Sequence, residues 1–127
     1  MEIENIKYIP NTALTMIEKE TLDKINRLIK ENKILFDFHA EVDILKQGYN
    51  WSKEFIIECL RKGRKYKGSE LYPEIKERKD RYYCIHKYSA LSSKLILMSF
   101  LVLENLVIIH IQPLNKGSKE GKIYYDL

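Results

Sequence analysis

Apolar side chains recur at helical spacing in the first half of the chain and fill strand-like runs in the second half. Between residues 12 and 32 the opposite positions are charged, and the apolar positions are Leu14, Ile17, Ile25, Leu28 and Ile29. This pattern predicts an amphipathic helix that docks its apolar side on the rest of the domain. Asn11 or Thr12 is its candidate N-cap. A role in dimerisation is the alternative.

A second, shorter helix is predicted from Asp37, a candidate N-cap, to Gly48, a residue typical of helix ends. Its expected apolar stripe consists of Phe38, Val42 and Leu45. His39 and Asp43 lie four positions apart and therefore share a face of this helix. A carboxylate so placed is expected to orient the imidazole.

The third predicted helix has the clearest start. Ser52 is a good N-cap, Trp51 precedes it, and Ile56 follows four positions later, which is the arrangement of a hydrophobic staple. Gly63 ends the helix. The residues expected to face the core are Phe55, Ile56, Cys59 and Leu60.

Strand patterns follow after a polar connection over residues 64–80. Residues 81–88 alternate, and residues 94–103 and 106–112 are β-rich runs on either side of Glu104-Asn105, a candidate hairpin turn. Pro113 is expected to end the last run, and residues 122–125 form a candidate final strand. The sequence thus predicts an α+β fold, with helices packed on one face of an antiparallel sheet of about four strands.

Length and composition fit one soluble domain. The 127 residues divide into a helical extension, residues 1–35, and an α+β core, residues 36–127. No membrane span is expected, because polar residues interrupt the longest apolar run, and the acidic N-terminus lacks a signal-peptide pattern. We therefore expect a cytoplasmic protein. Cys59 and Cys84 have no metal-ligand spacing and are expected to be buried thiols.

The charge balance permits a nucleic-acid partner. The chain has 22 basic and 18 acidic residues, a net charge of +4. Residues 61–67 hold a basic cluster with an aromatic residue inside it: Arg61, Lys62, Arg64, Lys65, Tyr66 and Lys67. It has two interpretations. Cations at a helix C-terminus complement the helix dipole, whereas a phosphate-contacting patch with a stacking tyrosine would bind RNA.

Three histidines are the candidates for acid–base chemistry. Metal-independent RNA cleavage needs a base for the 2′-hydroxyl, a proton donor for the leaving oxygen and cations for the phosphate. His39 and His86 are the candidate catalytic residues. His110, within the apolar run LVIIHIQ, is interpreted as structural. No cofactor and no metal are expected, since no close ligand pair such as two helical histidines or paired cysteines occurs.

The segment His39-Ala40-Glu41, the helix that follows, the capped helix WSKEFIIECLRKG and the later strands resemble the RelE and ParE superfamily of small toxins. The resemblance covers residues 36–112. The branch that the chain resembles opens with a His-Ala helix, and an arginine commonly follows the His-Ala pair by three positions. Here that position is Asp43, which removes a phosphate-binding cation.

Two functions follow as hypotheses. By the resemblance, the chain is a RelE-like ribonuclease toxin or a degenerate relative, with RNA as substrate and an antitoxin protein as partner. His39 or His86 would then transfer protons, while phosphate would be held by Arg61, Arg64, Arg81 and Lys87. The alternative is a non-catalytic interaction module that binds a protein, or a second copy of itself, through the N-terminal helix or a sheet edge.

Overall fold

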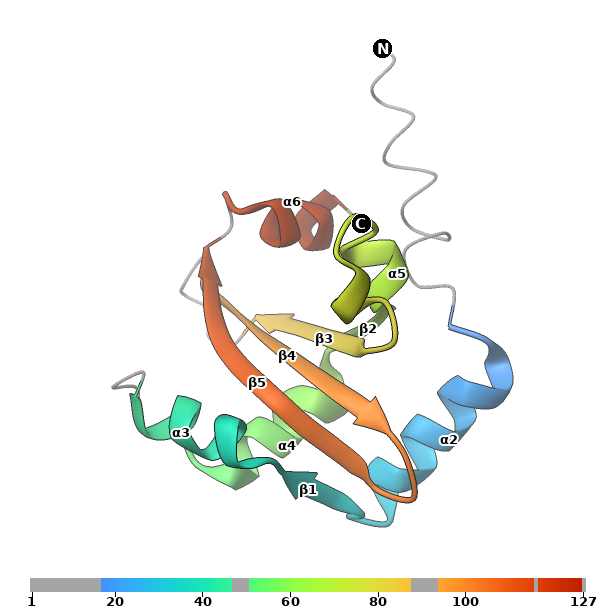
Figure 1. Cartoon of the computed structure of the whole chain (residues 1–127). Coiled ribbons are helices and arrows are strands. Elements are labelled where there is room, and N and C mark those ends of the chain that lie inside the picture. Colours follow the sequence, from blue (N-terminus) through green and yellow to red (C-terminus); the bar gives the residue numbers. More distant parts are fainter. Residues whose placement is uncertain (1–16, 47–50, 88–93, 116, 127) are drawn as a thin grey trace.

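The computed structural model describes residues 17–46, 51–87, 94–115 and 117–126, and of residues 94 and 123–126 the backbone alone. The strands form one sheet in the order β1-β5-β4-β3-β2 (Figure 1). They are β1 (Ile34–Phe36), β2 (Arg64–Lys67), β3 (Tyr82–Lys87), β4 (Lys94–Val102) and β5 (Leu106–Asn115). All neighbours are antiparallel except β1 and β5. The predicted α+β class is confirmed. The sheet has five strands because β1 and β2 join the three predicted strands β3, β4 and β5.

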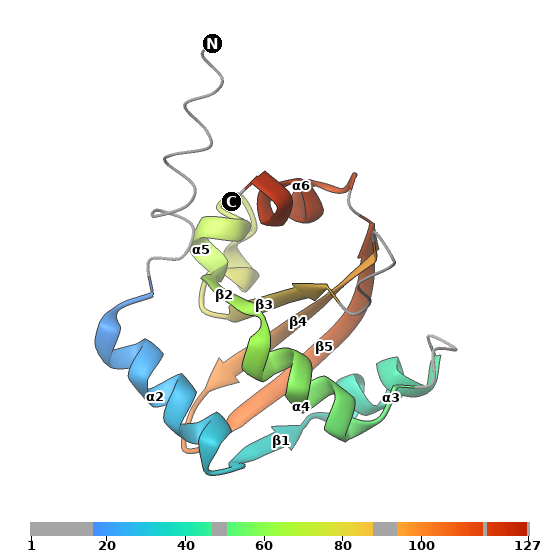
Figure 2. The same cartoon turned by 180° about the vertical axis from the view of Figure 1, so that it is seen from behind.

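Helices α2 (Lys19–Lys30) and α4 (Lys53–Lys62) lie across one face of the sheet, as predicted (Figure 2). Helix α2 begins after Glu18, later than predicted, and the candidate caps Asn11 and Thr12 lie outside the described residues. Their inward side chains pack on alternate residues of β4 and β5 in a core that includes Ile25, Ile56, Leu60, Met98, Phe100 and Ile108, all fully buried. Burying one such side chain stabilises the fold by about 1.5–3 kcal/mol. This core fixes the sheet on which the candidate site is built.

A second, smaller core lies on the opposite face, which we call the open face. There α5 (Gly68–Leu71) and the short 3₁₀ turn η1 (Lys76–Arg78) pack over one half of the sheet, around Tyr66, Leu71, Tyr72, Tyr83, Ile85, Leu95 and Leu97. The predicted strand at residues 122–125 is wrong, because α6 (Lys119–Asp126) forms there. Ser118 starts that helix by accepting the Gly121 N–H on its hydroxyl, at 3.0 Å.

Helix α3 (Phe38–Lys46) runs along the edge of β5 beyond the short strand β1 (Figure 1). Asp37 starts it as predicted, accepting the His39 N–H on its side chain at 3.3 Å. The predicted apolar stripe is wrong: Phe38 is 71% exposed and Leu45 83% exposed. Buried Ala40 instead packs on the core, so the helix is rotated relative to the expectation. Gly48, its predicted end, lies outside the described residues.

The predicted boundaries of α4 and of the hairpin are confirmed. The Ser52 hydroxyl accepts the Phe55 N–H at 3.0 Å, and Gly63 follows the last turn. Strands β4 and β5 are antiparallel and joined across residues 103–105. Pro113 does not end β5, which continues to Asn115.

Strand β5 carries one extra residue relative to β4. Ser99 pairs with His110, and the next residue, Phe100, pairs with Ile108, so Ile109 is bulged out. Ile108 faces the core under α2 and α4. Strict alternation would therefore have turned His110 into that core, and the bulge moves it to the open face instead.

Candidate active site

Two histidine rings face each other beside the N-terminus of α3. The ring centroids of His39 and His110 are 5.5 Å apart, and the planes are tilted by 55°. The side chains are 66% and 48% exposed, so both rings are open to a ligand. A base and an acid at this separation can act on two sides of one small group.

His39 is oriented by Asp37, two residues before it. Its Nδ1 lies 2.9 Å from Asp37 Oδ2. A carboxylate only accepts, so Nδ1 donates, and in the neutral ring Nε2 is the basic nitrogen. The hydrogen bond from His39 is the largest cause that lowers the pKa of Asp37, whose carboxyl is therefore ionised at neutral pH. The N-cap thus also fixes the tautomer of His39.

His110 is oriented by Asp43 of α3, across 67 residues of sequence. The Asp43 Oδ2 lies 3.3 Å from His110 Nδ1 and also accepts the Ile111 N–H at 2.9 Å. The second bond satisfies a strand-edge donor that β1 is too short to reach. The prediction that Asp43 orients His39 is therefore wrong. Asp43 orients His110 instead, because α3 turns its side chain toward β5.

Replacing Asp43 by asparagine should weaken both the fold and the chemistry. The amide accepts less strongly and no longer fixes the tautomer of His110, so the reaction proposed below, RNA cleavage, should slow by at least about tenfold. Unfolding in urea should show a loss of about 1–2 kcal/mol in the free energy of unfolding. Asp23→Asn, which removes only the exposed pair with Lys19, is the control and should stay within about 0.5 kcal/mol of wild type. Unchanged cleavage in Asp43→Asn would contradict an orienting role.

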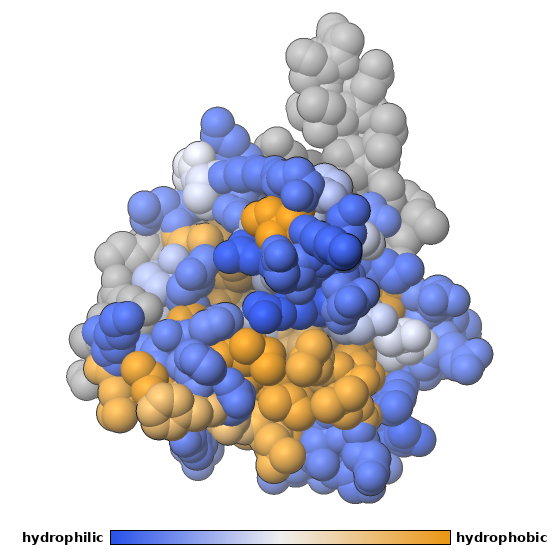
Figure 3. All heavy atoms as spheres, viewed as in Figure 1, coloured by the Kyte–Doolittle hydropathy of each residue, from blue (hydrophilic) through white to orange (hydrophobic). Residues whose placement is uncertain are grey.

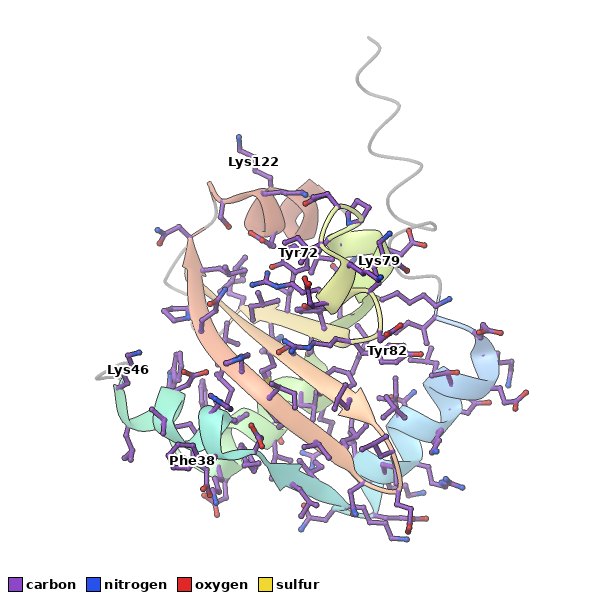
Figure 4. All side chains as sticks on the ribbon, viewed as in Figure 1. Phe38, Lys46, Tyr72, Lys79, Tyr82 and Lys122 are labelled. Atoms are coloured by element: carbon purple, nitrogen blue, oxygen red, sulfur yellow. The ribbon has the colours of Figure 1, made fainter. Side chains whose placement is uncertain are left out.

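A polar pocket adjoins the histidine pair on the open face. It encloses about 200 Å³ between the sheet and the α5–η1 segment, and His110 forms part of its wall. Its other lining residues are Tyr72, Arg78, Arg81, Tyr83, Leu97, Ser99 and Gln112. We call it the tyrosine–arginine pocket. Figure 4 places Tyr72 at the end of the sheet where α5 and α6 meet.

The second predicted catalytic residue, His86, lies elsewhere. It is on β3, which β4 separates from β5, and its ring faces α4 rather than His39. Its Nδ1 is buried without a hydrogen-bond partner among the described residues. Burial lowers the pKa of His86, repulsion from Lys62 and Lys65 lowers it further, and Glu58 opposes the shift. This histidine is neutral and packed in the folded protein.

His86 should make the fold sensitive to mild acid. Its unfolded pKa is near 6.5 and its folded pKa is lower, so the unfolded chain binds the extra proton first. Stability is then full above about pH 6.5 and falls as the pH drops through the folded value. Urea unfolding of wild type and His86→Gln at pH 7.5, 6 and 5 should show a smaller loss in the variant. Equal losses would mean that His86 does not titrate in this range.

The predicted phosphate-binding residues divide between the two faces. Arg81 lines the tyrosine–arginine pocket. Arg61 is on α4, on the opposite face, where it pairs with Glu58. Arg64 is exposed on β2, and Lys87 is exposed at the end of β3. Lys65 donates to the carbonyls of Arg61 and Gly63 at the end of α4, which favours the helix-capping interpretation of this cluster.

The sequence reasoning missed Asp37, Arg78 and His110 as members of the site. The Asp-x-His spacing at a helix start was the available signal for Asp37. His110 had none, because the bulge that redirects it leaves no mark in an apolar run. Cys59 and Cys84 are free and buried, as predicted. Burial raises the pKa of Cys59 to about 11 and that of Cys84 to about 12, so neither is a reactive thiolate.

The described residues contain no cluster of three or more histidine, cysteine or acidic side chains that could hold a metal ion. Within the same residues, no helix has the length and apolarity needed to cross a membrane. Comparison of the chain with protein-family models, with curated proteins and with solved structures gives no match.

Proposed function

We propose that the protein is a metal-independent endoribonuclease, a RelE-like toxin or a relative of that group. The observation that carries the proposal is the pair of facing, exposed histidines, each bonded to its own carboxylate. Both rings are held through Nδ1, which leaves both Nε2 atoms for a substrate. Each carboxylate is itself fixed by the fold, Asp37 as the N-cap of α3 and Asp43 by the Ile111 N–H, so the two rings are held in fixed orientations.

The reaction is an in-line transfer at phosphorus. One histidine Nε2 removes the proton from the ribose 2′-hydroxyl, and O2′ attacks the adjacent phosphorus. The bond from phosphorus to O5′ breaks, and the other histidine, protonated, gives its proton to O5′. The products are a 2′,3′-cyclic phosphate and a 5′-hydroxyl. Arg81 and Arg78, in the adjoining pocket, supply positive charge close to the reacting group.

Cleavage of RNA by the purified protein in the presence of a chelator tests this proposal. Wild type should degrade a structured and an unstructured RNA without added metal, and its expression should slow cell growth. A protein that folds but leaves both RNAs intact would exclude the catalytic function.

A protein-interaction module is the second candidate function, and a different observation favours it. Apolar side chains gather over the lower half of the open face (Figure 3). Leu35, Val107 and Leu101 are aligned across three strands there, and Leu35 and Leu103 are 53% and 55% exposed. Exposed apolar groups of this kind mark protein-binding surfaces. The proposed occupant is an antitoxin or a second copy of the chain. Size-exclusion chromatography of the protein alone distinguishes them, because only self-association gives a dimer without another protein.

A further inference from the structure

The tyrosine–arginine pocket has a floor of buried hydroxyl groups that lack a well-formed hydrogen bond. The Ser99 and Tyr83 side chains come from neighbouring strands and are 4% and 2% exposed. Ser99 Oγ has no hydrogen-bond partner among the described residues. The Tyr72 and Tyr83 hydroxyls lie beside Glu120 and Arg81, respectively, but neither meets its neighbour at full hydrogen-bond geometry. Each such group costs about 1–3 kcal/mol unless a ligand or water satisfies it. Three of them around one cavity indicate a site for an acceptor-rich ligand.

The charge of the lining specifies an anion. Arg78 and Arg81 both line the pocket, and the Arg78 guanidinium lies 4.6 Å from the centre of the Tyr72 ring. That stacking holds Arg78 in place, because a planar cation on an aromatic face is restricted in its rotation. No acidic side chain is among the lining residues: Glu120 on α6 interacts with the Tyr72 hydroxyl from outside the lining, and Asp43 is bonded to His110 at the pocket wall.

The hydroxyl groups remain donors at neutral pH. Burial raises the pKa of Tyr83, and burial together with Glu120 raises that of Tyr72. Both phenols are therefore protonated when the two arginines are charged. The pocket offers hydroxyl and guanidinium donors to the same small volume.

The shape of the pocket favours the end of a chain over its middle. Its floor is the sheet itself, from β3 to β5, so a ligand enters and leaves by the same opening. A phosphodiester must continue on both sides, whereas a phosphate monoester presents three free oxygens and two negative charges. Two arginines match those charges, and the floor hydroxyls match the oxygens.

We infer that the tyrosine–arginine pocket binds a terminal phosphate monoester of an RNA strand and so places the strand end beside the His39–His110 pair. The choice of RNA as ligand rests on the proposed function. The recognition of the phosphate group does not, because it depends on the hydroxyls and arginines alone. The enzyme would then cut near a phosphorylated end rather than at random.

Calorimetry with inorganic phosphate tests the pocket directly. Wild type should bind one phosphate, Arg78→Gln should weaken binding by at least about tenfold, and Ser99→Ala by a few-fold. Arg27→Gln is the matched control, since Arg27 is exposed on α2 on the other side of the sheet, and it should bind as wild type does. Equal affinity in Arg78→Gln and Arg27→Gln would overturn the inference.

Oligoribonucleotides identify the source of the phosphate. Strands with a 5′-phosphate, with a 3′-phosphate or with hydroxyls at both ends are compared for binding to His39→Ala, which should bind without cleaving. One phosphorylated end should bind at least about tenfold more tightly than the hydroxyl-ended strand. Equal binding of all three strands overturns the inference while leaving cleavage by wild type intact. Conversely, if wild type binds phosphate but cleaves no RNA, the proposed function is wrong and the phosphate site still stands.

Discussion

Alanine in place of His39 or His110 is expected to lower RNA cleavage by about 10²–10⁴-fold. In the proposed mechanism each histidine provides one half of a coupled proton transfer, and such a group contributes that range to a rate. Because the two act as a unit, the double variant should be little slower than either single variant.

His86→Ala is the matched control for this comparison. It removes the same side chain from the other face of the sheet, so it should keep the cleavage rate, although it opens a gap beside α4 and lowers stability. His39 and His110 are exposed, and their removal should shift the free energy of unfolding by less than about 0.5 kcal/mol in each case. Cleavage that survives in both single variants would show that the facing histidines are not the catalytic pair.

Gly68→Ala is expected to have the largest effect on both stability and the pocket. Gly68 joins β2 to α5, and its N–H donates to the Arg81 carbonyl at 2.7 Å. An added Cβ would overlap the Arg78 carbonyl and lie 2.8 Å from that of Arg81. Both are backbone atoms, so the segment that carries both arginines must move. A loss of about 3 kcal/mol in the free energy of unfolding should result.

Phosphate binding should be lost in the same variant, because Arg78 would leave its position over Tyr72. Gly117→Ala is the control: nothing lies within 4 Å of its added Cβ, and it should match wild type in urea unfolding and in calorimetry. A Gly68→Ala protein with wild-type stability would mean that residues 78–81 do not pack on α5 as described.

Local patterns along the chain predicted the starts of α3 and α4 and the β4–β5 hairpin. Ser52, Asp37 and Gly63 act on their immediate neighbours, so the capping chemistry can be recognised in the sequence. The rotation of α3 could not be recognised in the sequence, because both faces of this helix carry apolar residues. Which face is buried depends on the edge of β5, where Asp43 meets an unpaired N–H.

The candidate site was only half predictable for a related reason. His39 lies at a helix start next to a capping aspartate, and both are visible in the sequence. Its partner depends on a one-residue bulge 70 positions later, and the pocket depends on the close approach of η1 to Gly68. These tertiary features place His110 beside His39, whereas His86 lies on the other face of the sheet. By residue type alone the two histidines are equally suitable partners.

The ends of the cleaved RNA test the central claim most directly. In the presence of a chelator, wild type should produce 2′,3′-cyclic phosphate and 5′-hydroxyl ends. A substrate with a 2′-deoxyribose at the cleaved position should stay intact, because the two-histidine mechanism uses the 2′-oxygen as its nucleophile. Products with a 5′-phosphate and a 3′-hydroxyl, or cleavage of the deoxy-substituted strand, would contradict the mechanism.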